Sequence, residues 1–171
     1  MSVESVAVVG IVGGVGTTRT VLELAGVLAR GGRSALVLDL DFATQGLERF
    51  LDERIDPDAT ALLADPDVEL TEAIHDWDVD GEGRLGLVPA FAPFAELATA
   101  KSASAGARVA DRLAEAGETF DHVLLDVPPV ASNQAVGAVT AAESVAGLIP
   151  PTERGVDSLQ RERGRLADVG S

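Results

Sequence analysis

A glycine-rich turn between an apolar run and a helical pattern constrains this chain more than any other feature. Residues 12–16 read VGGVG, and the apolar run at 5–12 leads into them. From 18 to 30 the apolar side chains recur with the spacing of one helix face. Glycines let successive backbone N–H groups turn toward one concavity, and a helix start adds the positive end of its dipole. The segment therefore predicts a strand, an anion-cradling loop and a helix.

The loop has the spacing of a nucleotide phosphate loop but lacks the lysine. In the Walker A pattern G-x-x-x-x-G-K-[ST], the lysine reaches the outer phosphates and the hydroxyl residue reaches magnesium. After Gly16 this chain has Thr17 in place of the lysine, and Thr18 at the hydroxyl position. A tight strand-to-helix connection that binds nothing would use the same glycines. The candidate nucleotide-binding residues are Gly13, Gly14, Val15, Gly16, Thr17 and Thr18.

Apolar strand patterns and helical patterns alternate along the chain. Besides 5–12, strands are predicted at 34–41, 84–89, 121–127 and 144–149. Helices are predicted at 18–30, 46–51, 59–64, 70–76, 105–116, 132–142 and 155–166. Strands joined by helical crossovers predict a mostly parallel sheet in a three-layer α/β sandwich. At 171 residues we expect a single domain, 1–171, of the P-loop nucleotide-binding type.

Aspartates end two of the predicted strands, at the sheet edge where ligands of such folds bind. Asp126 ends the apolar strand VLLD, so we expect it to hold magnesium together with Thr18, through a metal-bound water. Helix capping is the alternative role for Asp126. Asp41 ends the second strand and is the candidate catalytic residue, because there it can orient an attacking water. Asp39 shares that strand, and one of the pair can be structural; Asp41 is nearer the edge.

The chain is strongly acidic. It has 28 acidic and 13 basic residues, a net charge of −15, and Lys101 as its only lysine. This composition is typical of proteins kept soluble in concentrated salt, so we predict a halophilic source. An acidic partner-binding face is the alternative, but the acidic residues are spread along the whole chain. Such a charge argues against nucleic-acid binding at low salt.

Several other classes of protein are disfavoured by the sequence. There is no cysteine, so disulfides and thiolate metal sites are excluded. The N-terminus lacks the basic start of a signal peptide, and no apolar run approaches the roughly 20 residues that span a bilayer. We therefore expect a cytoplasmic protein without a direct membrane anchor.

With these features in place, the chain resembles the MinD/ParA family of deviant-Walker P-loop ATPases over about residues 4–160. The family loop K-G-G-x-G-K-[ST]-[ST] appears here as VGGVGTTR at 12–19. The segment at 119–129, TFDHVLLDVPP, is similar to its Walker B strand. Residues 23–41 and 144–161 resemble its following helix and strands. The resemblance implies ATP and Mg²⁺ as cofactors and a nucleotide-dependent dimer.

The chain departs from the family pattern at two lysines. The signature lysine, which in family dimers reaches the partner's nucleotide, matches Val12, and the loop lysine matches Thr17. Family members also continue through further strands that contribute an adenine-contacting asparagine, and MinD adds a membrane helix. The sequence reads as a degenerate, C-terminally short member of the family.

Two functions follow from this resemblance. One is a non-hydrolysing or weakly nucleotide-binding regulator in cell division or partitioning, forming a homodimer or pairing with an intact paralogue; its ATP and Mg²⁺ binding is weakened or lost. The absent lysines favour it. The other is an active ATPase that dimerises on Mg-ATP, favoured by the retained Thr18, Asp41 and Asp126.

Overall fold

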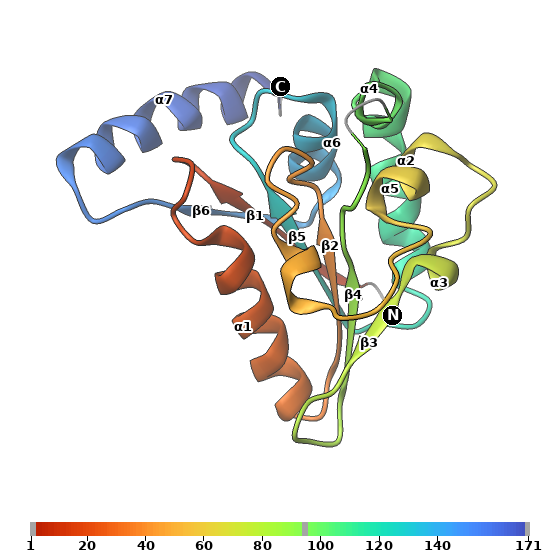
Figure 1. Ribbon diagram of the computed structural model, residues 1–171. Coiled ribbons are helices and arrows are strands. Elements are labelled where there is room, and N and C mark those ends of the chain that lie inside the picture. The colour runs from red at the N-terminus through yellow and green to blue at the C-terminus, as the bar shows by residue number, and fades with distance from the viewer. Residues whose placement is uncertain (1–2, 94–95, 170–171) are drawn as a thin grey trace.

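A mostly parallel six-stranded sheet forms the centre of the computed structural model, which describes residues 3–93 and 96–169 (Figure 1). The strand order is β3-β4-β2-β5-β1-β6, and only the β3–β4 pair is antiparallel. The strands are β1 (Glu4–Gly10), β2 (Ser34–Asp39), β3 (His75–Trp77), β4 (Arg84–Val88), β5 (His122–Val127) and β6 (Ser144–Leu148).

Helices cover both faces of the sheet, which confirms the expected three-layer sandwich. Helix α1 packs on one face, and α2 to α6 pack on the other. The helices are α1 (Thr17–Arg30), η1 (Leu47–Phe50, a 3₁₀ turn), α2 (Ala59–Ala64), α3 (Leu70–Ala73), α4 (Leu97–Ala100), α5 (Ala103–Ala116), α6 (Asn133–Ala141) and α7 (Glu153–Val169). Among the described residues, no helix is long and apolar enough to cross a membrane.

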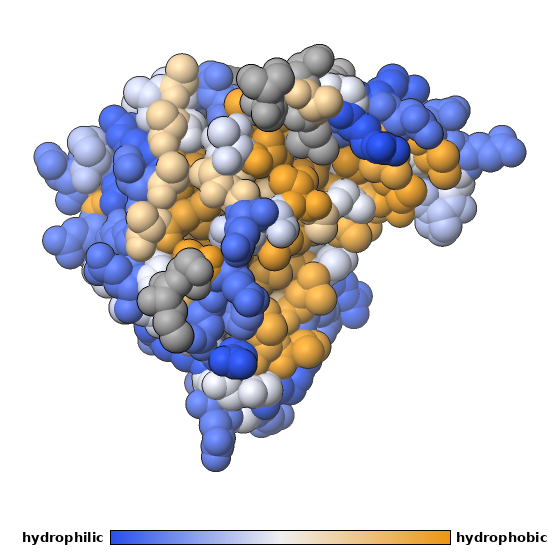
Figure 2. Space-filling model, turned by 180° about the vertical axis from the view of Figure 1, so that it is seen from behind, coloured by the Kyte–Doolittle hydropathy of each residue, from blue (hydrophilic) through white to orange (hydrophobic). Residues whose placement is uncertain are grey.

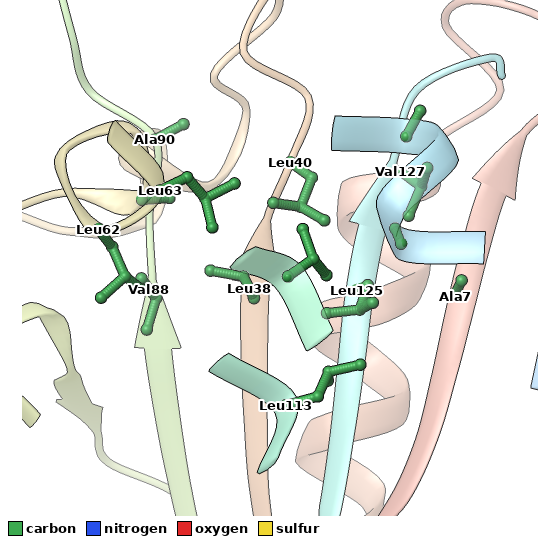
Figure 3. Close-up of a cluster of buried hydrophobic side chains, with 14 of the residues drawn as sticks. Ala7, Leu38, Leu40, Leu62, Leu63, Val88, Ala90, Leu113, Leu125 and Val127 are labelled. Atoms are coloured by element: carbon green, nitrogen blue, oxygen red, sulfur yellow. The ribbon is translucent and has the colours of Figure 1, made fainter. Parts of the chain in front are cut away.

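The strands carry continuous apolar runs because both of their faces are buried. On β1, Ala7 and Val9 pack under α5 and α6, whereas Val8 packs against α1. Leu38 and Leu125 lie side by side in register on β2 and β5. Both belong to the larger hydrophobic cluster, on the face of the sheet that α5 and α6 cover (Figure 3). This packing fixes the register in which β2, β5 and β1 end at one edge of the sheet.

The region between β2 and β4 differs from the sequence prediction. The helix expected over 70–76 ends at Ala73, and 75–77 forms the antiparallel edge strand β3 instead. Tertiary contacts overrode the helical pattern. Strand β3 pairs with β4, and the Trp77 ring packs edge-on against the Phe50 ring, with 6.4 Å between the ring centroids. Helix α4 was not predicted.

Two strands end two residues earlier than the sequence suggested. β1 stops at Gly10 rather than residue 12, and β2 stops at Asp39 rather than residue 41. The backbone therefore turns before the glycine loop in one case and before Asp41 in the other. Both changes matter for the candidate site.

Candidate functional site

The glycine loop leaves strand β1 and enters helix α1 in a conformation that requires glycine. Gly14 has φ 78°, and Gly16, at the start of α1, has φ 88° and ψ 31°. Both lie in the left-handed region that other residues seldom adopt. No side chain caps the start of α1, and its first turn contains no acidic residue. The N–H groups at the start of α1, together with the exposed glycine backbone, thus provide the hydrogen-bond donors and the positive dipole end that bind an anion.

Thr17 occupies the lysine position without supplying a charge. Its side chain is partly buried, and its hydroxyl lies against the end of β1, since a Cβ atom built on Gly10 would come within 2.4 Å of Thr17 Oγ1. A second departure from the Walker pattern was not predicted. Five residues before Gly16, where the pattern has its first glycine, stands Ile11, which is buried and lies beside Gly147 of β6. The fixed spacing from Gly16 is the sequence signal that identifies this position.

Thr18 and Asp126 meet where α1 begins and β5 ends. The Thr18 hydroxyl lies close enough to the Asp126 carboxylate to lower the pKa of that group, and Asp126 is 1% exposed. Within the described part of the chain, Asp126 Oδ2 accepts no hydrogen bond. Gly46 lies against Thr18, because a Cβ atom there would come within 2.7 Å of Thr18 Oγ1. An unpaired buried carboxylate oxygen beside a hydroxyl suits a hydrated Mg²⁺ ion.

Burial changes the acidity of this carboxylate. It raises the pKa of Asp126 to about 6; the Thr18 hydroxyl lowers that pKa, and the negative charge of Asp41 raises it. The buried charge is therefore destabilising at neutral pH unless a cation or a donor compensates it. A cation bound at Asp126 would supply that compensation.

Asp39 and Asp41 have different roles in the structure. Asp39 is fully buried and faces Asp126 in the β2–β5 register; it accepts hydrogen bonds from the N–H groups of Asp41 (2.9 Å) and Leu47 (3.2 Å). Burial, and then the charge of Asp126, raise the pKa of Asp39 well above its usual value. Asp39 is thus the structural member of the pair.

Asp41 lies in the turn after β2. The prediction that Asp41 ends the strand itself is wrong, because β2 stops at Asp39. Its Oδ1 accepts hydrogen bonds from the N–H groups of Ala43 (3.3 Å) and Thr44 (3.2 Å), which fix the turn. It is partly exposed and close enough to affect the charge of Asp126. The structure therefore gathers the loop, Thr18, Asp41 and Asp126 at one edge of the sheet. Among the described residues, no three histidine or acidic side chains are grouped to hold a metal.

The chain is similar to proteins of one known family. The model of the AAA domain family AAA_31 matches residues 3–161. The chain is 35% identical over 170 residues to the chromosome-partitioning ATPase Soj of Thermus thermophilus, covering 98% of this chain and 61% of that protein. It belongs to the MinD/ParA family of P-loop ATPases.

A second relative is similar to most of the chain. The maintenance of carboxysome distribution protein A of Synechococcus elongatus is 29% identical over 163 residues, covering 92% of this chain and 62% of that protein. The chain thus spans about three fifths of the length of these two relatives.

Solved structures of similar proteins carry nucleotide and magnesium. Cobyrinic acid a,c-diamide synthase from Mycobacterium smegmatis, bound to ADP and magnesium, superposes with a TM-score of 0.78 at 27% identity, over 99% of this chain and 70% of that one. MinD from Pyrococcus horikoshii with Mg-ADP gives 0.82 at 19% identity, over 98% and 66%. The similarity to the MinD structure confirms the P-loop fold.

The pKa of Asp126 predicts how stability depends on pH in this MinD/ParA-family chain. In the unfolded chain this aspartate ionises near its ordinary value of 3.8, and in the folded protein near 6. Its contribution is therefore fully present below pH 3.8 and is lost as the pH rises through 6. Without nucleotide or Mg²⁺, the native protein should lose about 2 kcal/mol more stability than Asp126→Asn between pH 4 and 8.

Urea unfolding at each pH measures this difference. Asp111→Asn, a change of an exposed aspartate on α5, is the matched control and should follow the native protein. Parallel stability curves for the native protein and Asp126→Asn would show that Asp126 carries no strained charge.

Proposed function

We propose that this protein is a MinD/ParA-type regulator that binds Mg-nucleotide weakly at residues 13–18 and does not hydrolyse it at a useful rate. The observation that carries the proposal is the site itself: a glycine loop with uncapped N–H groups, next to a buried Asp126 with an unpartnered oxygen, but with Thr17 where the positive charge belongs. Losing one preorganised donor typically slows catalysis by roughly 100- to 1,000-fold.

Each retained residue has a role in this proposal. The N–H groups of Gly13, Gly14, Val15, Gly16 and Thr17 would hold the phosphates, and Thr18 and Asp126 would hold hydrated Mg²⁺. Asp41 would orient water, a role that has little effect while Thr17 leaves the outer phosphates uncompensated. Bound Mg²⁺ would supply charge compensation for the phosphates. Residues 1–171 would act as one nucleotide-binding domain.

The cellular role is inferred from the relatives. Soj is a chromosome-partitioning ATPase, and the second relative is a protein for the maintenance of carboxysome distribution. We place this protein in cell division or partitioning, in the cytoplasm of a halophile, as a homodimer or paired with an intact paralogue. The paralogue would supply the signature lysine that Val12 lacks.

An active Mg-ATP-dependent ATPase is the second candidate. The contact between Thr18 and Asp126 and the nearby Asp41 favour it, because hydrolysis needs all three. Incubation with Mg-ATP in molar KCl, followed by chromatography of the bound nucleotide, separates the two. We expect bound ATP to stay intact for many turnover times of an ordinary family ATPase. Conversion to ADP at an ordinary rate would establish the active enzyme instead.

A further inference from the structure

The turn between β2 and η1 crosses the carboxyl edge of the sheet from one face to the other. Phe42, near its start, is fully buried in the hydrophobic cluster under α5 and α6. Figure 2 shows the molecule from the side of these helices, where further apolar side chains gather across the middle of the view. Leu47, just past the end of the turn, is fully buried in the cluster under α1. Residues 43–46 therefore pass over the edge of the sheet where β2 ends.

Gln45 occupies this turn in a conformation that side chains seldom adopt. Its φ is 49°, and among the described residues it is the only one besides glycines with a positive φ. Such a conformation persists where the surroundings hold it, and residues held in this way are frequent at functional sites. The Gln45 backbone N–H donates to the Asp41 carbonyl oxygen at 2.8 Å. The strained residue therefore closes the turn that carries Asp41.

The side chain of Gln45 makes the hydrogen bonds that hold it in this conformation. Its amide nitrogen Nε2 donates to the Phe42 carbonyl at 3.3 Å, within the turn, and to the Ala92 carbonyl at 3.1 Å, in the loop after β4. The amide has two N–H hydrogens, and these two carbonyls use both. One side chain thus ties the turn to a loop 47 residues further along the chain.

The turn places two residues at the candidate magnesium site. Asp41 lies at its start, with its carboxylate fixed by the N–H groups of Ala43 and Thr44. Gly46 lies at its end, so close to Thr18 that a Cβ atom on Gly46 would come within 2.7 Å of the Thr18 hydroxyl oxygen. If the turn moved away from the loop after β4, both Asp41 and the backbone that confines Thr18 would move with it.

We propose that Gln45 is a positioning residue for the candidate magnesium site, which it serves by tying the 41–46 turn to the loop after β4. This rests on the proposed function, because the site in question is the one that would hold Mg-nucleotide. Gln45 acts through Asp41 and Gly46 and not by donating to the ligand, since both of its amide hydrogens are already used. Removing a group that orients the residues around a metal typically lowers metal affinity by roughly 10- to 100-fold.

Gln45→Met tests this assignment, because methionine has the same length but no N–H group to donate. Mg-ATP affinity should fall by about 10-fold, whereas ATP affinity measured with EDTA should not change. Gln45→Gly removes the amide and also relieves the positive φ, so it should lose the same magnesium-dependent affinity without losing stability toward urea. Gln160→Met, at an exposed position of α7, is the matched control and should bind as the native protein does.

Combination with Asp126→Ala separates positioning from a general loss of structure. If Gln45 acts only through the magnesium site, Gln45→Met should cost no further Mg-ATP affinity once Asp126 is alanine. Without any ligand, hydrogen exchange of the Leu47 amide reports on the turn, because this N–H donates to the buried Asp39 carboxylate. Exchange there should be about 10-fold faster in Gln45→Met, while amides in the middle of β2 keep their native rates.

The outcomes distinguish the role of Gln45 from the proposed function. Native binding of Mg-ATP that Gln45→Met leaves unchanged overturns the role of Gln45 alone, and so does an unchanged exchange rate at Leu47. Equal losses of Mg-ATP affinity with and without the Asp126 carboxylate overturn it too, because Gln45 would then support the fold and not the metal.

A native protein that binds no Mg-ATP contradicts the proposed function, and the comparison then moves to Gln45→Met in the Thr17→Lys protein. A magnesium-dependent loss there supports the role of Gln45. If the Thr17→Lys protein also binds no Mg-ATP, there is no site for Gln45 to position, and both proposals are wrong.

Discussion

Replacing Thr17 by lysine is expected to raise the rate of ATP hydrolysis by about 100- to 1,000-fold. Thr17 is the first residue of α1, directly after the left-handed Gly16, so a side chain there starts from the mouth of the loop. A lysine ammonium can reach the outer phosphates, whereas the threonine hydroxyl is folded against Gly10. The new charge would act where negative charge develops during hydrolysis.

Phosphate release under saturating Mg-ATP in molar KCl measures this gain. Val27→Lys adds the same charge on the exposed side of α1 and should leave the rate unchanged. A Thr17→Lys protein that binds ATP tightly but hydrolyses no faster would show that the missing lysine is not what limits turnover. The other departures, at Val12 and Ile11, would then need testing.

Replacing Asp126 by alanine should weaken Mg-ATP binding by about 10- to 100-fold, the usual cost of losing a group that holds a metal-bound water. Affinity for ATP measured with EDTA should change little, because the loop N–H groups are untouched. The loss should therefore be confined to the magnesium-dependent part of the binding free energy. Thr18 alone would remain at the magnesium position.

Titration of ATP with and without Mg²⁺ separates these two contributions. Asp111→Ala removes an exposed aspartate from α5 and serves as the control for net charge. If Asp126→Ala binds Mg-ATP as well as the native protein does, Asp126 has only a structural role, and the magnesium assignment is wrong.

Much of the fold could be predicted because its strands are buried on both faces. The apolar runs that became β1, β2 and β5 have no polar alternation, which is the pattern of an interior parallel strand. The loop could also be predicted, because Gly14 and Gly16 adopt positive φ values that most other residues do not tolerate, and glycine at these positions is visible in the sequence.

The parts that could not be predicted depend on long-range contacts. Strand β3 has only three residues, and nothing in His-Asp-Trp reveals its pairing with β4. The division of labour between Asp39 and Asp41 depends on where β2 stops, and element ends are weakly encoded. Asp39 became structural because the loop returns at Leu47 to donate to it, a contact set by tertiary packing.

The central claim is that residues 13–18 are still a nucleotide site although they lack the lysine. Calorimetric titration of Mg-ATP into the native protein in molar KCl tests it most directly, with Thr17→Lys beside it. We predict measurable but weak binding by the native protein and tighter binding by Thr17→Lys. Absence of binding by both proteins would contradict the claim, because the glycine loop would then be only a connection between β1 and α1.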